Sequence, residues 1–231
     1  METFLIAGSS AYSGRTTASL LLALGLSQLG LNTLHIQVTA SDEQPMLQGE
    51  ATAPFGATWL AANKRAPSLA EIKLCVGQAS RTEAIVVDLP ASTFDRGWIT
   101  DPAVRMLLPM WTSSADVEQV ARDFHQIAGV PVQPGLGLPW ILPVGWPSAM
   151  RQLDYEPILG RVTRRLRLPA PTSDRVIQPG GIPWFDFRSE PLIVEGRIAL
   201  SSLRAMAAEV IAHAVLKTTG SSLLEVPHDA S

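Results

Sequence analysis

The sequence has few of the features that mark secreted, membrane-spanning or nucleic-acid-binding proteins. It holds a single cysteine, Cys75, which excludes an internal disulfide and fits a small core residue. No apolar run is long enough to cross a bilayer, and the start, METFLI, lacks the basic segment that opens a secretory signal. The net charge is −3 at pH 7, so no overall positive field attracts nucleic acid. These absences favour a cytoplasmic protein without a membrane anchor.

The composition instead indicates a packed globular protein. Of the 231 residues, 46% are hydrophobic and 17% are charged, which suits one large domain rather than two. We expect residues 1–217 to form this single domain and residues 218–231 to form a flexible C-terminal tail. The sequence contains 18 prolines, and those clustered in residues 131–191 predict long irregular connections in the C-terminal half.

The first thirty residues predict a strand, a tight loop and a helix in that order. Residues 4–7 are apolar, the small-residue loop runs from Gly8 to Gly14, and a long apolar helix opens at Arg15 and ends near Gly30. In this arrangement the N–H groups of the loop and the positive end of the helix dipole point at one spot. The stretch therefore predicts a cradle for a phosphate, although similar glycine turns also occur in doubly wound folds that bind no nucleotide.

The spacing of the loop partly matches the phosphate-loop pattern GxxxxGK[ST]. Gly14 and Thr16 fit the pattern, while Ser9 stands at the first glycine and Arg15 stands at the lysine. The planar guanidinium of arginine is bulkier than the compact ammonium of lysine, and the two are not interchangeable beneath phosphates. We therefore expect the cradle to have lost efficient ATP hydrolysis.

On these residues the N-terminal unit resembles the MinD/ParA family of deviant Walker-type ATPases, whose loop reads KGGxGKTT. Ser10 replaces the signature lysine of that family, and Ala11 and Tyr12 replace its two glycines. The resemblance implies a nucleotide-binding loop made of Ser10, Ala11, Tyr12, Ser13, Gly14, Arg15, Thr16 and Thr17. It also implies ATP or ADP with Mg²⁺ as the cofactor, and a chain that has lost nucleotide altogether is the alternative.

Residues 33–38 predict a second strand, after which the family carries a D-x-D-P-Q type motif. The carboxylates of that motif orient the attacking water and coordinate the magnesium shell. Here Gln37, Val38, Thr39, Ala40 and Ser41 occupy those places, and none is acidic. Asp42 and Glu43 follow closely and could reach the same space, or they could be ordinary solvated loop residues.

Residues 83–92 form an apolar run that is typical of a parallel strand buried on both faces. Asp88 lies near its end, at the edge where ligands bind in open α/β sheets. The run resembles the second acidic motif of the family, which implies that Asp88 and the Thr16 hydroxyl hold the magnesium ion. The alternative is that Asp88 only caps the turn before Pro90.

The remaining pattern alternates helices and strands and predicts an α/β fold, a doubly wound and mostly parallel sheet flanked by helices, as in P-loop NTPases of the MinD/ParA type. We expect helices at 69–79, 116–128 and 203–216, strands at 104–110 and, near a sheet edge, 138–144, and a hairpin-like region at 193–200. Residues 44–67 predict a surface loop or a short helix. The helix at 69–79 has a capping box of Ser68 and Glu71. The helix at 203–216 has a core face made of Met206, Ala207, Val210, Ile211 and Ala214.

Residues 150–168 carry the densest basic cluster of the chain. The candidate DNA contacts are Arg161, Arg164, Arg165 and Arg167, with Arg151 nearby. Contacts to phosphates through such a cluster would be non-specific and sensitive to salt. ParA-like proteins hold DNA through C-terminal basic residues of this kind. A solvated face paired with Asp154 and Glu156 explains the cluster equally well.

These observations predict a degenerate ParA/MinD-like protein with weak or no ATPase activity. It would act in positioning or partition of DNA or of a cellular assembly, or in a secretion or synthesis machinery, through a partner protein and through non-specific DNA. We expect a homodimer or heterodimer, but Ser10 cannot supply the lysine that reaches across the ATP-gated homodimer of the family. Two alternatives stay open: an active P-loop enzyme, such as a partition ATPase or a dethiobiotin-synthetase-like ligase, and a nucleotide-free structural scaffold.

Overall fold

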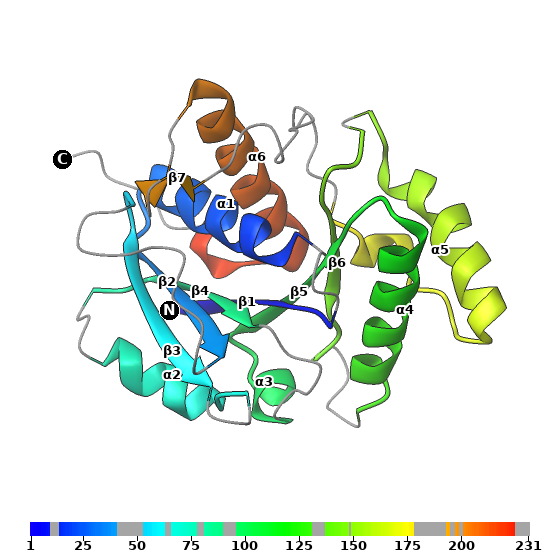
Figure 1. The fold of residues 1–231 in the computed structure, drawn as a ribbon, viewed down its shortest axis with the longest axis horizontal. Helices are drawn as coiled ribbons and strands as arrows, with labels where there is room; N and C mark the ends of the chain where they lie inside the picture. Colours follow the sequence, from blue (N-terminus) through cyan, green and yellow to red (C-terminus); the bar gives the residue numbers. More distant parts are fainter. Residues whose placement is uncertain are drawn as a thin grey trace.

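A sheet of six parallel strands forms the centre of the protein in the computed structural model (Figure 1). The structure describes residues 1–9, 14–40, 53–62, 66–77, 81–89, 96–130, 137–147, 149–177, 193–194, 197–198 and 201–224. The strand order is β3-β2-β4-β1-β5-β6. The bounds are β1 (Glu2–Ala7), β2 (Thr33–Ala40), β3 (Gly56–Ala62), β4 (Ala84–Leu89), β5 (Val104–Met110) and β6 (Trp140–Pro143).

Helices cover both faces of this sheet, which confirms the predicted doubly wound α/β fold. α1 and α6 lie on one face, α2 and α3 lie on the other, and α4 and α5 lie beyond β5 and β6 (Figure 1). The helices are α1 (Arg15–Gln28), α2 (Leu69–Val76), α3 (Arg96–Thr100), α4 (Ser114–Ala128), α5 (Gln152–Leu166) and α6 (Ser202–Thr219). The short elements are η1 (Ser173–Arg175), η2 (Ser222–Leu224) and the hairpin of β7 (Ile193–Val194) and β8 (Arg197–Ile198).

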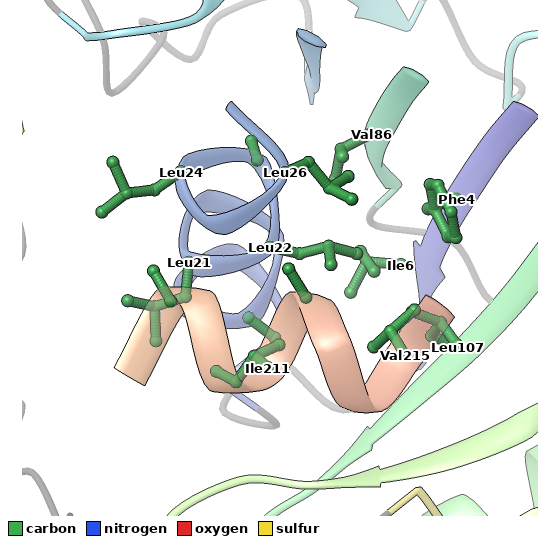
Figure 2. Packing of buried hydrophobic residues seen from close by; sticks show 14 of the residues in the cluster. Phe4, Ile6, Leu21, Leu22, Leu24, Leu26, Val86, Leu107, Ile211 and Val215 are labelled. Atoms are coloured by element: carbon green, nitrogen blue, oxygen red, sulfur yellow. The ribbon is translucent and has the colours of Figure 1, made fainter. Parts of the chain in front are cut away.

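The two middle strands are hydrophobic along most of their length because both of their faces are covered. All residues of β1 and β4 are buried, which is the pattern of a parallel strand inside an α/β protein. Between α1 and the sheet, Leu22 and Leu26 pack near Ile6 and Val86 (Figure 2). This packing holds α1 against the middle strands of the sheet, with its first residue, Arg15, beside Asp88 near the end of β4.

α1 and α6 approach each other closely where both carry small residues. A Cβ added at Gly25 would lie 2.0 Å from the carbonyl oxygen of Ala208 and 2.8 Å from the Cβ of Ala212. Ile211 and Val215 of α6 fill the space beside this crossing (Figure 2). The glycine therefore sets the distance between the two helices, and α1 is held from both sides.

Several predicted elements are confirmed at their local signals. α1 begins at Arg15 as expected, and α2 carries the predicted capping box of Ser68 and Glu71. The predicted strand at 104–110 coincides with β5, and β6 forms the sheet edge opposite β3. Cys75 is only half-buried. Among the described residues, no helix is long and apolar enough to span a membrane.

The prediction of a loop or short helix for residues 44–67 is wrong where the structure describes that stretch. Residues 56–62 form β3, an edge strand paired in parallel with β2 from Gly56 to Ala62. Its side chains are mostly exposed, and Trp59 is 50% exposed. The strand therefore lacks a buried, alternating pattern, and its backbone pairing with β2 is what holds it.

The last helix ends later than predicted, and its predicted core face is right at Ala207 and Ile211, which are buried, and wrong at Met206. Met206 is 55% exposed, whereas Ala208, Ala212 and Val215 are fully buried against α1. Met206 was expected in the core from its spacing along the helix, but the close crossing with α1 buries alanines instead. α6 continues to Thr219, and beyond it the Ser221 hydroxyl and the Ser222 N–H donate to the Glu2 carboxylate, while the bounds of the domain and of the tail stay a prediction. Residues 225–231 lie outside the described residues.

Candidate functional site

The candidate site lies where β1 ends and α1 begins. Gly14 is the N-cap of α1 and has a left-handed backbone (φ 76°), which favours glycine. Within the described residues no side-chain hydrogen bond caps the helix at this end, and the first helical hydrogen bond runs from the Ala18 N–H to the Gly14 carbonyl oxygen. A Cβ at Gly14 would lie 3.1 Å from Val144 and 3.3 Å from Trp111. Two hydrophobic side chains therefore close one side of the turn.

Arg15, the residue at the lysine position of the loop pattern, forms an ion pair with Asp88. Its Nε donates to Oδ1 of Asp88 at 2.7 Å, and its Nη1 donates to the carbonyl oxygen of Gly8 at 3.4 Å. The Asp88 side chain is 2% exposed and the Arg15 side chain is 16% exposed. The two charges predicted to face a ligand thus face each other.

Ser9, near the start of the loop, is hydrogen-bonded to two residues of α4. The Ser9 N–H donates to Oδ2 of Asp123 at 3.0 Å, and its hydroxyl lies 2.6 Å from Oδ1 of the same carboxylate. The Gln119 amide donates to the Ser9 hydroxyl at 2.7 Å and to Asp123 at 3.0 Å. These bonds link the start of the loop to a helix that follows it by more than a hundred residues.

Ser19, near the start of α1, joins this helix to β2 through His35. The Ser19 hydroxyl donates to the carbonyl oxygen of Thr16 at 2.9 Å and lies 3.1 Å from Nε2 of His35. A hydroxyl has one hydrogen, so with that hydrogen on Thr16, Nε2 of His35 must be the donor to Ser19. Burial lowers the pKa of His35 to about 4, and the nearby Asp88 carboxylate opposes this only in part. His35 is therefore neutral at pH 7 and fixed as the Nε2–H tautomer.

Gln37 and Thr39 of β2 lie on the same face of the sheet as Asp88. Gln37 pairs in register with Asp88, and alternate residues of a strand share a face. Thr39 is 2% exposed, and its hydroxyl has no hydrogen-bond partner in the part of the chain that the structure describes. The positions that carry carboxylates in the family thus present an amide and a hydroxyl here.

The structure describes only part of the predicted loop. Gly14, Arg15, Thr16 and Thr17 lie at the start of α1 and are half-buried. Residues 10–13, which include the predicted Ser10, Ala11, Tyr12 and Ser13, lie outside the described residues, as do Asp42 and Glu43. The nucleotide-binding role of the loop stays a prediction.

The magnesium role expected for Thr16 and Asp88 also stays a prediction, and the Arg15 contact argues against it. Asp88 is in the expected place, at the end of β4 and beside α1. Among the described residues, no three His, Cys, Asp or Glu side chains gather as a metal-binding group. The alternative of a simple cap before Pro90 cannot be compared, because residues 90–95 are outside the described ranges.

The two tryptophans near the site have structural contacts. Trp111 packs against Gly14 and Gly145, where an added Cβ would lie 2.9 Å from its ring. Trp146, which could stack on a base, donates from Nε1 to the carbonyl oxygen of Met110 at 2.7 Å and packs edge-on against Tyr155. Trp146 therefore connects the end of β5 to α5.

The predicted DNA-binding arginines lie on and just after α5. Arg165 forms an ion pair with Glu118 of α4, and Arg164 donates to the carbonyl oxygen of Gly160 within its own helix. Arg161 and Arg167 are exposed. Arg151 pairs with Asp154, as the solvated-face alternative expects. The DNA role is not tested by these contacts and stays a prediction.

Sequence reasoning missed two of the residues that hold the site. Asp123 lies among the buried residues of α4, next to Val120 and Phe124, and a carboxylate inside such an apolar stripe is a usable signal. His35 is a second signal, because it is the one titratable side chain of β2 (Thr33–Ala40). In each case the pattern shows that a polar group is buried, whereas its partner comes from a distant part of the chain.

The comparisons with known proteins concern the fold of the chain. No family model matches the chain, and no curated protein sequence matches it. A ParA family ATPase from Chlorobium tepidum TLS is similar in structure, with a TM-score of 0.54 and 11% identity over 94% of this chain and 97% of that one. The chain has the MinD/ParA fold.

Two further structures share the MinD/ParA fold with this chain. A putative plasmid partition protein from Borrelia burgdorferi B31, bound to AMPPNP, has a TM-score of 0.54 and 14% identity over 94% of this chain and 98% of that one. The MinC:MinD cell division complex of Aquifex aeolicus gives a TM-score of 0.50 and 11% identity over 100% of this chain and 98% of that one. At these identities the likeness concerns the fold alone.

Proposed function

We propose that this chain is a degenerate member of the MinD/ParA type that hydrolyses ATP weakly or not at all and acts by binding a partner protein. The partner would belong to a machinery that positions or partitions DNA or a cellular assembly, or that serves secretion or synthesis. The observation that carries the proposal is the Arg15–Asp88 ion pair at 2.7 Å. In this pair Arg15 and Asp88 bind each other, whereas a phosphate-transfer site needs both charged side chains for its substrate.

The chemistry of phosphoryl transfer supports the loss of hydrolysis. Such enzymes rely on a lysine over the phosphates, a metal ion on an acidic side chain, and a residue that positions the attacking water. Here Arg15 stands at the lysine position, and Gln37 and Thr39 stand where the family has carboxylates. An amide and a hydroxyl bring no negative charge for a metal shell.

Phosphate release and calorimetry with ATP, ADP and GTP test this proposal. We expect phosphate release with ATP and Mg²⁺ to stay at the background of the buffer, in the wild type and in the Arg15→Ala variant alike. Arg122→Ala, which changes an exposed arginine of α4, is the matched control for charge. Phosphate release that disappears only in Arg15→Ala would show that the chain is an active P-loop enzyme. If calorimetry detects no heat of binding with ATP, ADP or GTP, the chain is a structural scaffold that binds no nucleotide.

Partner binding is supported by the fold and by the exchanged loop residues. The Aquifex aeolicus structure of the same fold is a MinC:MinD complex. In this chain, serine replaces the signature lysine at position 10, so a dimer gated by ATP is not expected. The mass measured by light scattering should therefore be unaffected by ATP, as for a constitutive dimer or for a chain that pairs with an intact homologue. A mass that doubles on adding ATP would contradict this part of the proposal.

Non-specific DNA binding is a second candidate function, favoured by the exposed arginines of α5. Arg161 and Arg164 are exposed and have no acidic partner among the described residues, whereas Arg165 is already paired with Glu118. At low salt, retention on duplex DNA should fall in the Arg161→Ala/Arg164→Ala variant. Arg165→Ala is the matched control and should lower retention less. Equal retention by wild type and double variant would remove this candidate.

A further inference from the structure

The Arg15–Asp88 pair determines the charge that the cradle presents. Both side chains are largely buried, so water and salt screen the pair weakly. The described residues accept hydrogen bonds from two nitrogens of Arg15, Nε to Asp88 and Nη1 to Gly8. A guanidinium carries about five N–H donors, so it can bind a second acceptor while it keeps a first one. The pair is neutral as a unit but still rich in donors.

The described residues do not fit a magnesium ion. Magnesium in nucleotide sites is held through one or two carboxylates together with phosphate oxygens. The carboxylate that the structure supplies, Asp88, already contacts a guanidinium, and a cation placed on it would lie beside a like charge. Gln37 and Thr39 add no acidic group on this face of the sheet. The charge and the ligand set both disagree with the ion that the fold family uses.

A separate observation points to a polar ligand in the same place. The hydroxyl of Thr39 is buried and has no hydrogen-bond partner among the described residues. Thr39 lies two residues after Gln37, which pairs in register with Asp88, so it faces the same side of the sheet as the ion pair. Buried hydroxyls in folded proteins are nearly always hydrogen-bonded. A phosphate oxygen would satisfy this one, and an apolar ligand would not.

We propose that the cradle binds a phosphate-bearing ligand without magnesium, and that Asp88 competes with the phosphate for Arg15 instead of holding a metal ion. The inference rests on the proposed function, since it concerns the same cradle. The phosphate takes hydrogen bonds from the guanidinium, from the N–H groups of the first turn of α1 and from Thr39. Asp88 keeps the guanidinium neutralised and in place when no phosphate is bound.

This assignment reverses the expected effect of removing the acid. In a magnesium site, loss of the carboxylate weakens nucleotide binding, because the metal ion loses its ligand. Here, loss of the carboxylate frees Arg15 and leaves its positive charge for the phosphate, so binding becomes tighter. Asp88→Asn keeps the shape of the side chain and removes its charge, and it separates the two cases by the sign of the change.

Isothermal titration of the full chain with ATP tests the inference, once in EDTA and once with excess Mg²⁺. We expect the Kd of Asp88→Asn in EDTA to be lower than that of wild type by on the order of tenfold. Adding Mg²⁺ should change neither Kd by more than about twofold. Asp101→Asn is the matched control, because it removes the same charge from a surface pair with Lys73 far from α1 and should leave the Kd unchanged.

Three outcomes would overturn the inference: tighter wild-type binding with Mg²⁺ than in EDTA, weaker binding by Asp88→Asn, or no binding by either protein at millimolar ATP. If Asp88→Asn does not fold, wild type and Arg15→Gln decide the question. Arg15→Gln should then lose ATP binding in EDTA while its circular dichroism stays native. Brisk turnover of ATP in EDTA would refute the proposed function alone, whereas magnesium-dependent binding without turnover would refute the inference alone.

Discussion

The two faces of the sheet differ at the carboxyl ends of the strands. In the carboxyl halves of β1, β2 and β4, the residues facing α2 and α3 are hydrophobic: Leu5, Ala7, Ile36, Val38, Val87 and Leu89. The residues facing α1 in the same halves include Gln37, Thr39 and Asp88. Burying polar groups destabilises a protein unless they find partners. The buried polar side chains therefore lie on the face that α1 covers, beside the loop. The face that α2 and α3 cover is hydrophobic and stabilises the fold.

The largest effect should come from the hydrophobic face. Trp98 of α3 is 1% exposed and donates from Nε1 to the carbonyl oxygen of Pro67 at 3.0 Å. Trp98→Ala leaves a large cavity and should lower the free energy of unfolding by about 4 kcal/mol, measured by urea denaturation. Trp59→Ala, at a half-exposed edge position, is the control and should lower it by less than about 1 kcal/mol. Similar losses in both variants would contradict the role given to this face.

A smaller loss is expected where α6 holds α1 on the other face. Gly25→Ala improves helix propensity, but its Cβ would lie 2.0 Å from the Ala208 carbonyl oxygen, so the helices must move apart. The free energy of unfolding should fall by about 3 kcal/mol. Gly160→Ala in α5 meets nothing within 4 Å and should raise it by about 0.5–1 kcal/mol. A gain in both variants would show that the α1–α6 contact is loose.

The buried histidine of the α1 face should make stability depend on pH. Burial lowers the pKa of His35 from its ordinary 6.5 to about 4, so the unfolded chain binds a proton at a pH where the folded chain does not. As the pH falls from 6.5 towards 4, the free energy of unfolding should fall by at most about 3 kcal/mol through this group.

The variant that checks this dependence is His35→Gln, with His125→Gln as an exposed control. Urea denaturation at pH 7, 5.5 and 4 should show a smaller loss with acid in His35→Gln than in wild type, and an unchanged loss in His125→Gln. An identical pH dependence in all three proteins would contradict the burial of His35 as the cause of its lowered pKa.

The smallest effects concern the two ion pairs compared by double-mutant cycles. Arg15→Met with Asp88→Asn should give a coupling free energy of about 2 kcal/mol, because this pair is largely buried. Arg165→Met with Glu118→Gln should give no coupling above the error of the measurement, because the pair is exposed. Equal coupling in the two cycles, measured by urea denaturation, would remove the distinction between the cradle and the surface.

The elements that local sequence determines could be predicted well. The apolar run at 4–7 and the start of α1 at Arg15 depend on neighbouring residues, and so does the capping box of Ser68 and Glu71. The position of Asp88 at the end of a buried strand follows from the same local pattern. These signals need no knowledge of distant partners, which is why the fold class could be predicted from the sequence.

The contacts of the site could not be predicted, because they join residues far apart in the sequence. Arg15 and Asp88 are separated by 73 residues, and Ser9 and Asp123 by 114. Which partner a buried charge finds depends on how α1 and α4 pack, and no local pattern encodes that. The same reason explains Met206, whose exposure depends on the α1 crossing rather than on its own hydrophobicity.

The bonds between Glu2 and the end of α6 have a consequence for biosynthesis. The Glu2 carboxylate accepts hydrogen bonds from the Ser221 hydroxyl and from the Ser222 N–H, 219 and 220 residues later in the chain. β1 leaves the ribosome before all other described elements, yet its neighbours β4 and β5 and this final clasp emerge long afterwards. A ribosome stalled before Ser221 would therefore carry a β1 whose Glu2 carboxylate still lacks both of these donors.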